Sequence, residues 1–112
     1  MRYLKFKDKI KTLKQLTEFE EALSKYRKEA TTSLGVRVIF SGSGYDNELA
    51  TNLGPSVVAS RIASALEGCC QSITTLNLGF WRLKIGSEGS KSLVAAIEKC
   101  SQNLLVVGLG FY

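Results

Sequence analysis

The chain has 112 residues, of which 45% are hydrophobic and one is proline, a composition typical of a single folded domain. No apolar run reaches the roughly 18 residues of a membrane span, and Met1 is followed by charged residues instead of a secretion signal. We therefore expect a soluble, cytoplasmic protein with no membrane association.

The net charge is +5, and most of it lies near the N-terminus. Residues 1–30 hold nine basic and five acidic side chains and so carry +4, whereas residues 31–112 carry +1. Such a segment could attract nucleic acid, acidic lipid or an acidic protein. Acidic residues are interleaved and no aromatic stacking pattern accompanies the lysines, so a solvated helix face is favoured over a nucleic-acid site. The lysines in question are Lys5, Lys7, Lys9, Lys11 and Lys14.

The chain has few side chains suited to catalysis or to metal binding. The three cysteines, Cys69, Cys70 and Cys100, form no C-x-x-C pair, which argues against a disulfide framework or a zinc site. The chain has no histidine, so the commonest general base and the commonest zinc ligand are missing. We expect no catalytic residue, no metal and no cofactor, and small buried side chains at Cys69 and Cys100.

Apolar residues recur every three or four positions between residues 4 and 29, which predicts a long amphipathic helix. Thr17 and Glu20 fit a capping box, so two shorter helices that meet near residue 17 are the alternative. Residues 1–33 are thus expected to form a basic helical N-terminal segment or cap.

Strand and helix patterns then alternate. V36-R-V-I-F40 predicts a strand that ends in the turn-rich loop S41-G-S-G-Y-D-N47. Pro55 opens a helical pattern that continues to Cys70. Its inner face should hold Val58, Ile62, Ala65, Leu66 and Cys69.

The same order follows a second time. Leu76, Leu78 and Phe80 alternate as in a strand, and residues 87–100 have helical periodicity. Burial is expected for Leu76 and Leu78 on the strand and for Gly89, Leu93, Ala96, Ile97 and Cys100 on the helix.

A shift of 31 residues aligns A65-L-E-G-C-C-Q-S-I73 with A96-I-E-K-C-S-Q-N-L104. The same shift aligns L76-N-L-G-F80 with V107-G-L-G-F111. Self-similarity at this period, with alternating strands and helices, is typical of a solenoid.

The stretches I73-T-T-L-N-L-G-F80 and I85-G-S-E-G-S-K-S-L-V-A-A-I-E-K-C100 resemble the leucine-rich repeat of the ribonuclease-inhibitor-like subtype. Units of that family run L-x-x-L-x-L, an asparagine, then I-G-x-E-G and a helix. The family's asparagine is missing here, with Trp81 or Leu83 in its neighbourhood, so the repeats resemble a variant L-x-L-x-L form.

The resemblance implies an α/β leucine-rich-repeat-like solenoid fragment in which parallel strands alternate with helices. Its units would be residues 34–72, 73–103 and a partial unit over 104–112. It also implies a non-enzymatic protein-interaction or scaffold module within a larger assembly or a longer array.

The C-terminal run L104-L-V-V-G-L-G-F-Y112 predicts an apolar strand that residues after it do not cover. We therefore expect a protein partner, a second copy of the chain or the folded-back N-terminal segment to cover it. The candidate partner-binding residues are Trp81, Arg82, Lys84, Phe111 and Tyr112.

Two other functions stay open. Gly42 and Gly44 follow a strand, as in a phosphate-binding loop of a small nucleotide-binding domain, but Asn47 stands where that motif has its third glycine. A turn-forming loop is the favoured interpretation. The basic N-terminal segment would suit a nucleic-acid-associated subunit, which the interleaved acidic residues disfavour.

Overall fold

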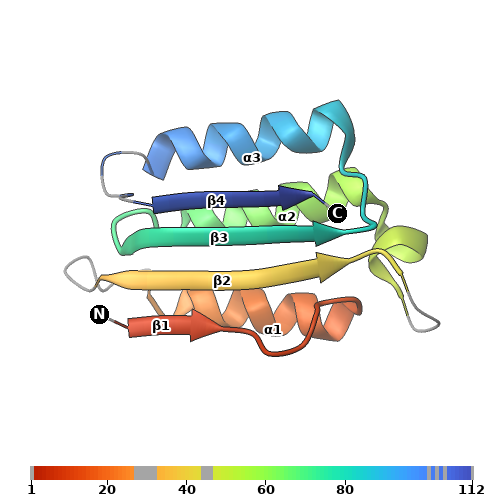
Figure 1. The fold of residues 1–112 in the computed structure, drawn as a ribbon, viewed down its shortest axis with the longest axis horizontal. Helices are drawn as coiled ribbons and strands as arrows, with labels where there is room; N and C mark the ends of the chain where they lie inside the picture. The colour runs from red at the N-terminus through yellow and green to blue at the C-terminus, as the bar shows by residue number, and fades with distance from the viewer. Residues whose placement is uncertain are drawn as a thin grey trace.

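Helices cover one face of a four-stranded parallel sheet whose strand order follows the chain (Figure 1). The computed structural model describes residues 2–26, 33–43, 47–100, 102, 104 and 106–111. The elements are β1 (Arg2–Lys5), α1 (Leu13–Ser24), β2 (Leu34–Ser41), a π-helical turn η1 (Leu49–Leu53), α2 (Pro55–Glu67), β3 (Ile73–Trp81), α3 (Gly86–Cys100) and β4 (Val106–Phe111). The predicted α/β class with parallel strands alternating with helices is confirmed.

The strand register agrees with the internal repeat. Leu76 of β3 pairs with Val107 of β4, and Phe80 pairs with Phe111, both at a separation of 31 residues. Val36 pairs with Leu76 at a separation of 40 residues. The longer unit, residues 34–72, holds the connection between β2 and α2, as its loop-rich sequence predicted.

Side chains alternate between the two faces of the sheet, as the strand geometry requires. Val36 and Val38 of β2 and their partners Leu76 and Leu78 of β3 point into the core and are buried. Arg37, between Val36 and Val38, is exposed on the opposite face. This open face and the strand ends therefore carry the side chains that could meet a ligand.

The N-terminal segment differs from its prediction. Residues 2–5 form strand β1, which pairs with β2, so the helix predicted over residues 4–29 is wrong in its first part. The helix begins after Thr12, whose hydroxyl accepts from the Gln15 amide at 3.1 Å while the Gln15 side chain accepts from the Thr12 amide at 3.2 Å. This capping box stands in place of the one predicted at Thr17, which lies inside α1. Residues 27–32 lie outside the described residues.

The position of β1 also tests the expectation that the N-terminal segment covers β4. Because β1 pairs with β2, it lies at the opposite edge of the sheet from β4 (Figure 1). The suggestion that the N-terminal segment folds back over β4 is therefore wrong.

Helices α2 and α3 pack closely against each other. Gly89 of α3 approaches the Ala59 side chain of α2, and a Cβ at Gly89 would lie 3.0 Å from the Cβ of Ala59. Leu93 and Ala96 are buried as predicted, but Ile97 is only half-buried. The prediction for Ile97 is wrong because this residue lies near the side of α3 that no neighbouring helix covers among the described residues.

Shortening Leu93 should destabilise this packing. Leu93 is 2% exposed, and we expect Leu93→Ala to lower the free energy of unfolding by about 2–4 kcal/mol. Urea denaturation followed by circular dichroism measures the change. Val94→Ala, one residue further along α3 and exposed, should stay within about 0.5 kcal/mol of the parent. Equal losses for the two variants would contradict the orientation of α3.

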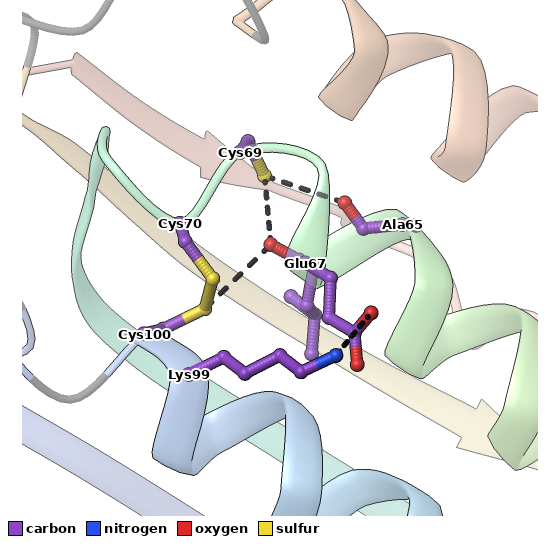
Figure 2. The surroundings of a disulfide bond; sticks show 7 residues. Ala65, Glu67, Cys69, Cys70, Lys99 and Cys100 are labelled. Carbon is purple, nitrogen blue, oxygen red and sulfur yellow. Dashed lines mark hydrogen bonds and ion pairs between the residues drawn. A yellow bond between two sulfur atoms is a disulfide. The ribbon is translucent and has the colours of Figure 1, made fainter.

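A disulfide joins Cys70 and Cys100, 30 residues apart, at the ends of α2 and α3 (Figure 2). The expectation of no disulfide is wrong, because packing of the two helices brings these ends together. The Lys99 ammonium lies 3.4 Å from the Glu67 carboxylate beside it. Cys69 is buried as predicted and stays outside the disulfide, its Sγ donating to the Ala65 carbonyl at 3.5 Å.

Disulfides persist in oxidising compartments and are rare in the cytosol. The cytoplasmic location expected from the sequence thus remains a prediction, and the Cys70–Cys100 bond argues against it. Among the described helices, none has the length and apolar character needed to cross a membrane.

Candidate functional site

Cations gather where the strands end. Lys7 and Lys9 follow β1, and Arg82 and Lys84 follow β3. The carboxyl ends of parallel strands share one edge of a sheet, which is where α/β proteins commonly bind ligands. Asp8 lies among the lysines, so the edge is predominantly but not uniformly basic.

Trp81, the last residue of β3, lies close to two of these cations. The Lys9 ammonium lies 4.1 Å from the centre of the Trp81 ring, and the guanidinium carbon of Arg82 lies 5.9 Å from it. Both distances permit cation–π attraction. The indole is half-buried, so part of this large ring remains accessible beside positive charge.

The backbone around Trp81 has a demanding geometry. Arg82 adopts φ 51, a left-handed conformation that is uncommon for a residue other than glycine. Gly42 lies so close to Arg82 that a Cβ at position 42 would collide with the Arg82 carbonyl oxygen. The Gly42 amide donates to the Trp81 carbonyl at 2.8 Å. The connection after β2 thus packs against the turn at Arg82 and is hydrogen-bonded to it.

An apolar hollow of about 580 Å³ opens beside this turn. It is lined by Phe80, Arg82, Leu83, Lys84 and Phe111. Phe80 and Leu83 form the buried floor, whereas Phe111 is 60% exposed at the rim. The hollow therefore combines an apolar base with two cationic side chains.

Phe111 is the last member of a row of aromatic rings on the helix-covered face. The rings of Phe40 and Phe80 stack with centroids 5.8 Å apart, and those of Phe80 and Phe111 stack at 5.4 Å. All three lie in register on adjacent strands. We call Phe40, Phe80 and Phe111 the phenylalanine ladder. Its outermost ring presents one side to solvent.

The open face of the sheet has a shallow groove of about 210 Å³. Arg37, Ile39 and Asn77 line one part of it, and Gly79, Gly108 and Gly110 line the rest. Gly79, Gly108 and Gly110 contribute no side chains of their own, and the side chains of Ile39 and Asn77 lie against Gly79 and Gly108. A Cβ at Gly108 would collide with the Asn77 side-chain oxygen, so a larger residue there would require the Asn77 side chain to move.

Four of the five predicted partner-binding residues meet at this edge. Arg82, Lys84 and Phe111 line the hollow, and Trp81 lies next to Arg82, whereas Tyr112 is outside the described residues. Sequence reasoning missed the contribution of Lys9 and the glycine groove. The alternation of glycine with apolar residues in Val106–Phe111 is the signal that could have indicated the groove.

Two alternative sites were predicted from the sequence, a phosphate-binding loop at Gly42 and Gly44 and a nucleic-acid site at the N-terminal lysines. The Gly42 amide, which a phosphate-binding loop would aim at its ligand, instead bonds to Trp81, and Gly44 lies outside the described residues. Lys7, Lys9 and Lys11 do surround a polar hollow of about 680 Å³ near Ser41 and Ser43. Within the described ranges, no cluster of three or more potential metal ligands occurs.

Comparisons of the chain with known protein families, with curated proteins and with solved structures find no match.

Proposed function

We propose that the chain is a non-enzymatic protein-interaction module of the leucine-rich-repeat type, which binds its partner at the carboxyl edge around Trp81 and along β4. The observation that carries the proposal is the apolar hollow beside Phe111, flanked by Arg82 and Lys84. The sequential parallel strands and the 31-residue register support the repeat assignment.

The composition of this edge suits a protein partner. Tryptophan and arginine are enriched among the residues that dominate interface energies, especially next to apolar pockets. Trp81 and Phe111 supply large rings, while Arg82 and Lys84 supply cations that would favour carboxylates on the partner. The partner should therefore combine apolar and acidic side chains.

Nucleic acid is the second candidate. The hollow near Lys7, Lys9 and Lys11 and the adjacent Trp81 ring offer cations and one stacking surface. The apolar side chains of β4 have no role in that interpretation, which is why we favour a protein.

Site-directed photo-crosslinking tests the proposed function. A photoreactive phenylalanine analogue at position 84 should give one defined protein adduct in cells, and the same analogue at position 14, on the exposed surface of α1, should not. The adducts are identified by mass spectrometry after nuclease treatment. Equal adducts from both positions, or an adduct only with nucleic acid at position 84, would contradict a specific protein-binding edge.

A further inference from the structure

We propose that the partner adds an extended segment to the outer edge of β4 as a further strand of the sheet. That segment carries apolar residues at alternate positions and acidic residues at the end beside Arg82 and Lys84. The inference rests on the proposed function and deepens it by naming how the partner binds.

The outer edge of β4 is unpaired among the described residues, and its apolar side chains are exposed. Within the described ranges β4 pairs with β3 on one side and with no strand on the other. Val107, Leu109 and Phe111 point to the helix-covered face, yet they are 44%, 42% and 60% exposed. An apolar edge of this kind is a ready template for another strand.

The phenylalanine ladder indicates what the added strand should carry. Adjacent strands lie about 4.8 Å apart, and the ladder repeats across three strands at ring spacings of 5.8 Å and 5.4 Å. A residue paired with Phe111 would meet the exposed side of its ring. A large apolar or aromatic side chain at that position would continue the ladder, and residues two and four positions away would cover Leu109 and Val107.

Helix α3 provides a surface beneath this position. In Figure 1, α3 lies beyond the β4 edge of the sheet. The 31-residue repeat places Val94 where α2 has Ala63, which is buried in the core. Val94 itself is exposed and Ile97 is half-buried. Apolar side chains of an added strand would thus find apolar surface on α3 as well as on β4.

The open face leaves room for the remaining side chains of the segment. Gly108 and Gly110 present no side chains toward that face, and Arg37 and Asn77 line the groove next to them. Side chains that alternate with the apolar positions could lean across Gly110, whereas the Asn77 side chain already lies against Gly108. The groove therefore favours long polar residues at the positions between the apolar ones.

Charge distinguishes a partner from a second copy. Arg82 and Lys84 lie at the Phe111 end of β4, so the added strand needs acidic residues at that end. The edge strands of a second copy are β1, R-Y-L-K, and β4, V-V-G-L-G-F, and neither contains an acidic residue. The net charge of +5 also opposes self-association.

Peptide binding to the full chain tests the inference. The probe is a fluorescent peptide with the order Thr-Val-Thr-Leu-Thr-Phe-Glu-Glu, and a second probe has the reverse order. Fluorescence anisotropy at low salt should show that the chain binds at least one of these two peptides. Two further forms of that peptide are N-methylated at alternate residues, one at the odd positions and one at the even positions. Comparing them distinguishes main-chain pairing with β4 from non-specific apolar binding. Methylation in one register should abolish binding, whereas methylation in the other should change it by less than about twofold.

Charge exchange tests the acidic end. Replacing the two glutamates of the peptide with lysine should weaken binding by about tenfold or more, and Arg82→Glu with Lys84→Glu should reverse that preference. Lys14→Glu with Lys25→Glu, a matched change at two exposed positions of α1 and its C-cap, should leave the preference as it was. Lys84→Glu alone repeats the test if the double variant unfolds, which circular dichroism reports.

Three results would overturn strand addition. They are no binding of either peptide order, equal binding of both N-methylated forms, and a homodimer in light scattering that Leu109→Lys dissolves. A protein adduct at position 84 combined with failure of every peptide would leave the proposed function in place and refute only this inference.

Discussion

Replacing Phe80 with alanine is expected to lower the free energy of unfolding by about 3–5 kcal/mol. Phe80 is 1% exposed and stacks between Phe40 and Phe111 at the centre of the phenylalanine ladder. The truncation would leave a cavity between β3 and the helices and would remove the floor of the apolar hollow. Urea denaturation followed by circular dichroism measures the loss.

Phe111→Ala is the matched control for this prediction. It removes the same side chain from the next position of the ladder, but Phe111 is already 60% exposed. Its loss should cost about 1 kcal/mol or less, because surface substitutions rarely cost more. If Phe111→Ala destabilised the isolated chain as much as Phe80→Ala, β4 would not be an uncovered edge strand.

Opening the Cys70–Cys100 disulfide should cost about 3–4 kcal/mol. The bond closes a segment with a sequence separation of 30 residues, so its loss increases the conformational entropy of the unfolded chain. The segment contains β3 and α3, which together position Trp81 and the hollow. Cys70→Ala should therefore unfold at a lower urea concentration than the parent chain.

The reduced parent chain provides the control. A thiol reductant should lower its stability toward that of Cys70→Ala and should leave Cys70→Ala itself unchanged. Cys69→Ala, which keeps the disulfide, should remain sensitive to the reductant. If Cys70→Ala kept the reductant sensitivity and Cys69→Ala lost it, Cys69 would be the partner of Cys100.

The amino-acid sequence by itself determined the elements with a complete local pattern. Helices α2 and α3 have several turns of apolar periodicity, and β2 and β3 are rich in β-branched and aromatic residues. The 31-residue repeat aligned Phe80 with Phe111, and these residues pair on adjacent strands. Trp81, Arg82 and Lys84 could be placed at a strand end because they follow the strand predicted at Leu76, Leu78 and Phe80.

Tertiary structure decided the rest. The four residues of β1 are too few for a clear alternation, and their strand conformation depends on pairing with β2. Cys70 meets Cys100, not the repeat-equivalent Cys69, because the disulfide follows the distance between the packed helix ends. The glycine groove and the contact of Lys9 with Trp81 likewise arise from strand register. Local periodicity reflects neighbours three or four residues away, whereas these features join residues brought together only when the units pack.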